Sequence, residues 1–276
     1  MPDADPTHLV TLAGLLLAIG GLSGIIAGML GVGGGIVLVP AFLYTFDILG
    51  YASPYLMQVC LATSLATIAV TSGRSVRGHM AKGAVDRDIL RGWAPFIALG
   101  AVIGVVVAGG MKSTVLMLTF GVLGTLIGLY IAFGRDDWRL GDHMPTRWGR
   151  WITGTVIGFL SVLMGIGGGS FGVPLMRLYN VPIHRAVGTA SGFGMVIAIP
   201  SVLGFLLSGW GLGGLPAGTV GLVNLPAFAI VVATTMITTP WGVALAHAMD
   251  PKPLKRIFGG FLIVVALNML RKALMG

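Results

Sequence analysis

The fold of this chain follows from a glycine-rich stretch that occurs twice. Residues 24–43 read GIIAGMLGVGGGIVLVPAFL, and residues 158–177 read GFLSVLMGIGGGSFGVPLMR. At a constant offset of 134 residues, both copies carry G-x-G-G-G followed by a proline five residues later. The match is imperfect, since Gly28 meets Val162. Self-similarity at a fixed period indicates a duplicated structural unit.

The sequence around these motifs has the composition of a membrane protein. Of its 276 residues, 55% are hydrophobic and only 9% are charged, whereas about 25% of the residues in a soluble domain are charged. The 45 glycines lie largely within apolar runs, as is typical of transmembrane helices. We therefore expect an integral membrane protein.

Apolar segments divide the chain into two similar halves. Full spans of about 20 residues are predicted at 9–30, 55–73, 92–110, 113–133, 187–207, 220–245 and 257–270, with shorter pieces at 36–46, 151–166 and 170–176. We expect a first transmembrane repeat over 1–133, a cytoplasmic connector over 134–150, and a second transmembrane repeat over 151–276. Each repeat holds a pair of segments joined by the glycine motif and three further spans.

Five segments per half place the two halves in opposite orientations. The predicted fold is an all-α integral membrane protein of two inverted-topology repeats. Each repeat is an interrupted helix pair or a re-entrant hairpin with a Gly-rich break, plus three transmembrane helices. Whether the first pair of each half crosses the membrane fully or re-enters it stays open, and the inversion holds in both cases. Secondary transporters with this construction bind substrate near the membrane midplane.

Basic residues predict the orientation of the chain in the membrane. Alternating sides along the chain puts 14 of the 17 basic residues on one face, in or beside the connectors at 74–91, 134–150, 177–185 and 252–256. The opposite face keeps Lys112, Arg271 and Lys272. The positive-inside rule makes the first face cytoplasmic and puts the N-terminus outside, in a multi-pass protein of the cell's inner (plasma) membrane. The acidic start, MPDADPTHL, predicts no cleavable signal. This distribution explains the net charge of +8 without a nucleic-acid partner.

The doubled motif carries a family resemblance. Each copy is followed by a Thr/Ser stretch, Ala62-Thr63-Ser64 in one half and Gly188-Thr189-Ala190-Ser191 in the other; Trp93-Ala-Pro95 answers Asn224-Leu-Pro226 more weakly. Over nearly its whole length the chain resembles the sulfite exporter family (TauE/SafE). The resemblance implies a multi-pass permease for sulfite, organosulfonates or related small sulfur-containing anions. One departure is that Gln58-Val59-Cys60 stands where the second half has His184-Arg185-Ala186.

The two breaks are the leading candidates for the substrate site. Glycine lets the backbone leave helical geometry and approach a ligand closely. The helix that begins after each break offers unpaired N–H groups and the positive end of its dipole, which suits an anion. In the alternative interpretation the glycines only permit close helix packing. The candidate residues are Gly33, Gly34, Gly35, Gly167, Gly168, Gly169 and Ser170.

Hydroxyl side chains in the next span of each half are further candidates. Thr63, Ser64, Thr189 and Ser191 either donate hydrogen bonds to the anion or bond to a carbonyl of their own helix. At the cytoplasmic mouth, Arg177, His184 and Arg185 either attract the anion or mark the interface and the orientation of the chain.

The predicted spans contain no Asp, Glu, Lys or Arg, which argues against cation transport through carboxylates. The five histidines are scattered and Cys60 is the one cysteine, so we expect neither an enzyme, nor a metal site, nor a cofactor. The leading hypothesis is an anion exporter working by alternating access, with the lipid bilayer and a small anion as its partners. Proton-coupled anion uptake and an anion channel are the alternatives. The sequence leaves open whether a single copy or a homodimer is the working unit.

Overall fold

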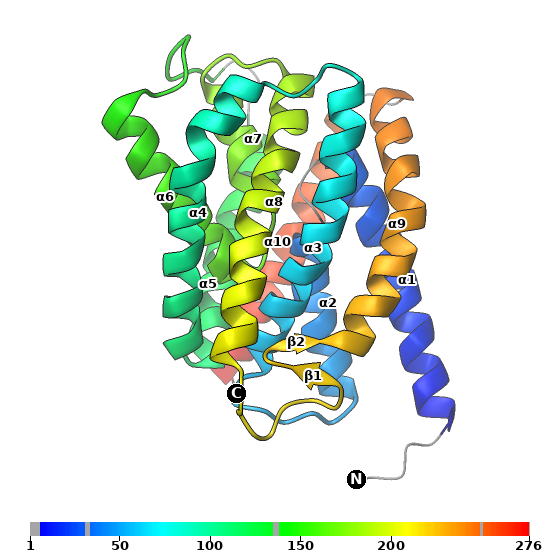
Figure 1. Ribbon diagram of the computed structural model, residues 1–276. Helices are drawn as coiled ribbons and strands as arrows, with labels where there is room; N and C mark the ends of the chain where they lie inside the picture. The colour runs from blue at the N-terminus through cyan, green and yellow to red at the C-terminus, as the bar shows by residue number, and fades with distance from the viewer. Residues whose placement is uncertain (1–5, 31–33, 135–137, 249–250, 276) are drawn as a thin grey trace.

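The computed structural model describes residues 6–30, 34–134, 138–248 and 251–275. Over these residues the chain is nearly all helical (Figure 1). The elements are α1 (Pro6–Leu30), α2 (Gly35–Ile48), α3 (Leu56–Ala81), α4 (Arg87–Gly110), α5 (Ser113–Phe133), α6 (Arg147–Met164), α7 (Gly169–Leu178), α8 (Ile183–Ser208), β1 (Thr219–Val220), β2 (Val223–Asn224), α9 (Leu225–Ala248) and α10 (Pro251–Met275).

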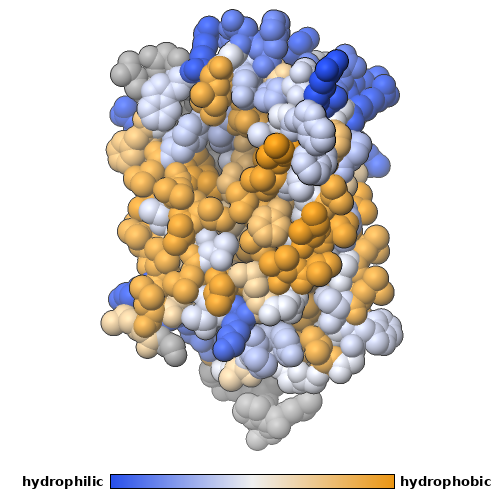
Figure 2. Space-filling model, turned by 90° about the vertical axis from the view of Figure 1, so that its left-hand side faces the viewer, coloured by the Kyte–Doolittle hydropathy of each residue, from blue (hydrophilic) through white to orange (hydrophobic). Residues whose placement is uncertain are grey.

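The outer surface of this bundle suits a lipid environment. Among the residues that the structure describes, six helices are long and apolar enough to cross a membrane: α3, α4, α5, α8, α9 and α10. Large apolar side chains point outward from them, and Val106 and Leu126 are 73% and 59% exposed. Figure 2 shows apolar side chains as a broad belt between more hydrophilic ends. A continuous apolar belt of this kind marks a membrane surface, so the prediction of an integral membrane protein is confirmed.

The two interrupted helix pairs enter the bundle from opposite ends. In Figure 1, α1 starts at the end where the chain termini lie, and α2 returns toward that end. The α6–α7 pair starts and finishes at the other end. The helix contacts of one half also have counterparts in the other half. The contact of α1 with α9 corresponds to that of α6 with α4, and the contact of α2 with α3 corresponds to that of α7 with α8. That the two halves are inverted repeats stays a prediction.

Some predicted boundaries are wrong. The predicted span 220–245 begins late, at Leu225, because residues 219–224 form a two-stranded hairpin in which Thr219 pairs with Asn224. The predicted connector 74–91 is much shorter, because α3 continues to Ala81 and carries Arg74 and Arg77 on its final turns. Long basic side chains reach the interface from such positions, so charge alone misplaced the helix end.

Glycines set the distance between neighbouring helices. On α6, a Cβ added at Gly158 would lie 2.9 Å from the amide nitrogen of Ala101 on α4. On α1, a Cβ at Gly24 would lie 2.8 Å from Cα of Thr235 on α9. The two contacts are equivalent, because the contact of α1 with α9 corresponds to that of α6 with α4. The small-residue run that includes Gly24 therefore mediates packing within the chain.

The connectors predicted to be cytoplasmic join helix ends that lie together. The adjoining ends of α3 and α4, α5 and α6, α7 and α8, and α9 and α10 share one end of the bundle (Figure 1). Figure 2 shows that this end is the most hydrophilic part of the view. That it faces the cytoplasm stays a prediction from the positive-inside rule.

We expect Gly158→Ala to destabilise the protein, because its methyl group would collide with the backbone of α4 at Ile97 and Ala101. Overpacking of this kind costs about 1–3 kcal/mol. Thermal unfolding in detergent measures the effect as a lower Tm. The matched control is Gly260→Ala on α10, where the methyl group meets open space. An unchanged Tm in Gly158→Ala would contradict this account of the α4–α6 contact.

Candidate functional site

The first break lies between α1 and α2. Gly34 precedes α2 with a φ of +78°, a left-handed conformation that favours glycine. Its carbonyl accepts hydrogen bonds from the amides of Val37 and Leu38, at 3.0 and 3.2 Å, and from the hydroxyl of Ser23 at 3.2 Å. Gly33 lies outside the described residues. Residues 34–40 are all buried, so α2 begins inside the protein.

The second break lies between α6 and α7. Gly165 ends α6 with a φ of +61°, and the Ile166 amide donates to the carbonyl of Ser161 at 2.9 Å. Gly168 has ordinary helical φ, and here the glycine is needed for space, because a Cβ would lie 2.9 Å from the carbonyl oxygen of Ala190 on α8. Residues 161–170 are all buried, Gly167 and Gly169 included.

The two breaks touch each other in the interior. A Cβ added at Gly35 would lie 2.8 Å from Cα of Ile166, and a Cβ at Gly165 would lie 2.7 Å from Cγ2 of Val39. The hydroxyl of Ser64, on α3, donates to the carbonyl of Gly165 at 2.7 Å. The halves of the chain therefore meet at their glycine motifs, and a side chain from the first half satisfies a backbone group in the second.

The predicted hydroxyls play different parts. Ser191 donates to the carbonyl of Gly188 on its own helix at 2.7 Å. Thr63 accepts the amide of Asn224 at 3.0 Å, and Thr189 accepts the amide of Asp86 at 2.9 Å. Each of these three hydroxyls is therefore hydrogen-bonded to a protein group, as Ser64 is.

Thr63 and Thr189 make equivalent contacts in the two halves. Each accepts the amide of the residue that caps the start of a helix. The Asp86 carboxylate accepts the amides of Asp88 and Ile89 at the start of α4, and the Asn224 side-chain oxygen accepts an amide at the start of α9. The alignment of the two halves by sequence placed Asn224 opposite Trp93. In the structure, Asn224 has the same role as Asp86, since each caps the start of a helix and donates its amide to a threonine.

Ser170 differs from the other hydroxyls. It lies in the first turn of α7, is 2% exposed, and its Oγ has no hydrogen-bond partner in the described part of the chain. The same holds for Ser161, which is fully buried in the last turn of α6. The sequence predicts Ser170 as a site residue from its place after the break, and this stays a prediction; nothing in the sequence singles out Ser161.

The mouth residues lie apart from the breaks. Arg177 is on the last turn of α7, where its guanidinium donates to the carbonyl of Val181 at 3.3 Å. His184 and Arg185 are exposed on the first turn of α8. All three belong to the end of the bundle predicted to be cytoplasmic, and the structure does not bring them to the breaks.

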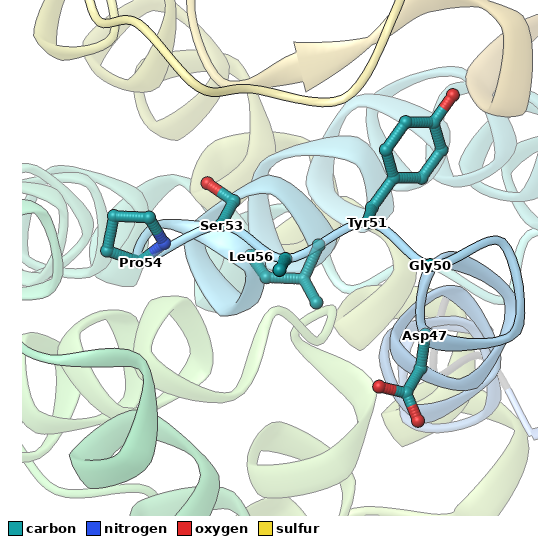
Figure 3. Close-up of a pocket in the computed structure, with 7 residues that line it drawn as sticks. Asp47, Gly50, Tyr51, Ser53, Pro54 and Leu56 are labelled. Atoms are coloured by element: carbon teal, nitrogen blue, oxygen red, sulfur yellow. The ribbon is translucent and has the colours of Figure 1, made fainter. Parts of the chain in front are cut away.

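A shallow hollow opens at the opposite end of the bundle. It encloses about 550 Å³ beside the α2–α3 connector, where Asp47, Tyr51, Ser53 and Pro54 are among its lining residues (Figure 3). Asp47 forms an ion pair with Lys272 at 2.7 Å, which ties α2 to α10. The hollow is a surface feature, while residues 34–40 of the first break are buried.

The fold is that of a multi-span membrane protein, and the comparisons with known proteins place it among transporters. The profile of the sulfite exporter TauE/SafE family matches residues 16–269. The chain belongs to this family. Membership in a family of transporters also confirms the expectation that the chain is not an enzyme.

Several relatives bear names of the same kind. A probable membrane transporter protein of Haemophilus influenzae is 32% identical over 258 residues, which cover 94% of this chain and 98% of the relative. A probable membrane transporter protein of Methanocaldococcus jannaschii is 26% identical, and the match covers 93% of this chain and 94% of that protein. YunE of Bacillus subtilis, also a probable membrane transporter protein, is 27% identical, and the match covers 71% of this chain and 78% of YunE. No solved structure matches the chain.

We expect Ser64→Ala to lower the stability of the closed protein, because it removes the hydroxyl that donates to the Gly165 carbonyl. Leaving a buried polar group without its partner costs about 1–3 kcal/mol. The change is measured as a drop in Tm in detergent. Ser191→Ala is the matched control, since that hydroxyl bonds only to its own helix. Equal Tm values for the two variants would show that the bond from Ser64 to the second break contributes nothing to stability.

Proposed function

We propose that this protein exports sulfite, organosulfonates or related small sulfur-containing anions by alternating access. The anion binds between the two glycine breaks, near the middle of the membrane. The observation that carries the proposal is that the starts of α2 and α7 are both buried, with the two breaks in contact. The family supplies the substrate class, through its name as a sulfite exporter.

Backbone groups give these breaks their preference for anions. The first amides of a helix lack an acceptor within the helix, and they carry the positive end of its dipole. Residues 34–46 and 151–176 contain no Asp, Glu, Lys or Arg. An anion bound there meets no fixed negative charge and needs no lysine or arginine. Because the surroundings are buried, each dipole acts more strongly than it would in water.

The closed breaks support a carrier in preference to an open channel. Residues 34–40 and 161–170 are buried, so an anion reaches them only when packed helices separate. Two hydrogen bonds between the halves lie at opposite ends of the bundle: Thr63 to Asn224 at the end that holds the β-hairpin, and Thr189 to Asp86 at the other. If one of these hydrogen bonds breaks while the other stays intact, the bundle opens at one end and remains closed at the other.

The membrane potential is sufficient to drive export. Moving one negative charge outward from a negative cytoplasm gains about 2.3 kcal/mol per 100 mV. A uniporter of a monovalent anion therefore needs no coupled ion. This matches the absence of acidic residues from the segments around the breaks.

The direct test is efflux from proteoliposomes loaded with sulfite or ethanesulfonate, with the membrane potential clamped. We expect an inside-negative potential to drive efflux without a pH gradient. Empty liposomes and a potential of zero are the controls. Movement of anions only when a proton gradient is imposed would replace this proposal with proton-coupled uptake. Single-channel currents would replace it with a channel.

The reactivity of Cys60 measures how readily the bundle opens at the hydrogen bond between Thr63 and Asn224, which we call the Thr63 gate. Cys60 is fully buried on α3, one turn before Thr63. In Thr63→Val the Asn224 amide loses its acceptor, so the closed state loses about 1–3 kcal/mol. We expect alkylation of Cys60 by a thiol reagent to quicken by about fivefold or more. Thr189→Val, which acts at the other end, leaves this rate nearly unchanged.

Thr119→Val is the control for a hydroxyl that bonds only to its own helix. Equal Cys60 labelling in Thr63→Val and Thr189→Val would contradict the assignment of the two bonds to separate gates.

A further inference from the structure

Many hydroxyls in the described helices donate to a carbonyl of their own helix. Thr67, Thr125, Ser201 and Thr239 each donate to the carbonyl four residues earlier. This is the usual solution for Ser and Thr in a membrane helix. A buried hydroxyl that does not use it costs about 1–3 kcal/mol unless some other group is its partner.

Two hydroxyls beside the second break make no such hydrogen bond within their own helix. Ser161 and Ser170 are 0% and 2% exposed, and neither Oγ has a hydrogen-bond partner in the part of the chain that the structure describes. Ser161 is one turn before Gly165, and Ser170 is in the first turn of α7. The hydroxyls of Tyr44, Ser75 and Thr155 are also unpartnered, but they lie away from the breaks, on α2, α3 and α6. Only the second break is thus flanked on both sides by such hydroxyls among the described residues.

The first break has apolar side chains at the same two positions. At the offset of 134 residues, Ser161 corresponds to Ala27 and Ser170 to Ile36. Ala27 is 3% exposed and Ile36 is fully buried. A Cβ on Gly34 would lie 3.5 Å from Cβ of Ala27, so this apolar residue belongs to the first break. At these two positions the side chains are polar beside the second break and apolar beside the first, where the Ser23 hydroxyl already donates to the Gly34 carbonyl.

We propose that the site binds an anion that has two unlike ends, a sulfonate group and an apolar substituent. The hydroxyls of Ser161 and Ser170, with the first amides of α7, bind the sulfonate oxygens. The first break, with Ala27 and Ile36, packs against the substituent. This inference rests on the proposed function and narrows its substrate class to organic sulfonates.

The physical reason is the difference between the two walls of the site. A hydrogen bond from a hydroxyl to a charged oxygen contributes about 1.5–3 kcal/mol, so the second break favours the anionic end. Ile36 offers no side-chain donor, and an oxygen placed against it loses water without replacement. Sulfite carries oxygens and no carbon, so it has no apolar part to place against the first break.

The experiment measures binding of ethanesulfonate and of sulfite to the purified full-length protein in nanodiscs, by titration calorimetry. We expect ethanesulfonate to bind at least tenfold more tightly than sulfite. Ser170→Ala weakens ethanesulfonate binding by about tenfold, the loss of one hydrogen bond to a charged group. Its Tm is unchanged or higher, because the hydroxyl it removes has no hydrogen-bond partner among the residues that the structure describes.

Two further variants separate a specific role from a loss of folding. Ser201→Ala removes a buried hydroxyl that bonds to its own helix, and it leaves both affinities unchanged. Ile36→Thr adds a hydroxyl to the first break, and Ile36→Val has the same size without it. We expect the threonine variant, but not the valine variant, to shift the preference toward sulfite.

The outcomes distinguish this inference from the function on which it rests. If both anions bind equally and Ser170→Ala changes neither affinity, the inference is overturned while a sulfur-anion exporter stands. If neither anion binds and neither is transported in proteoliposomes, the proposed function fails, and the inference fails with it.

Discussion

A backbone that leaves helical geometry inside hydrocarbon must find its hydrogen-bond partners within the protein, because lipid offers none. This chain breaks a helix at Gly34 and again at Gly165. The structure meets the requirement by burying both breaks against each other and against α3 and α8. Ser64 supplies a donor to Gly165 across the two halves. The second break thus takes a hydrogen-bond partner from the first half, and the contact between the breaks joins the two halves.

The same constraint explains the rest of the helix arrangement. The interrupted pairs must lie deep in the bundle, which requires close contact with the long helices beside them. Glycine provides that contact where α1 meets α9 and where α6 meets α4, as at Gly24 and Gly158. The long helices α3 and α8 pair with each other at the centre of the bundle. The apolar belt outside the helices is left for lipid (Figure 2).

The doubled motif predicted most of this fold, because its glycines and apolar spans are local features of the sequence. The equivalence of Asp86 and Asn224 could not be predicted in the same way. Both residues cap a helix and donate their amide to a threonine, at Thr189 and Thr63. In the second half, the segment that contains the β-hairpin separates α8 from α9 and shifts the register. Ser161 was missed because an isolated serine in an apolar helix carries no sequence signal; only its burial and its unpartnered hydroxyl distinguish it.

The central claim is that the two breaks form a single anion site. Hydrogen–deuterium exchange of the protein in nanodiscs, with and without saturating ethanesulfonate, tests it most directly. The account predicts slower exchange of the backbone amides at residues 34–38 and 165–172 together, because both helix starts contribute to the site. Slower exchange confined to the surface hollow beside Tyr51 (Figure 3), or to one break alone, would contradict it.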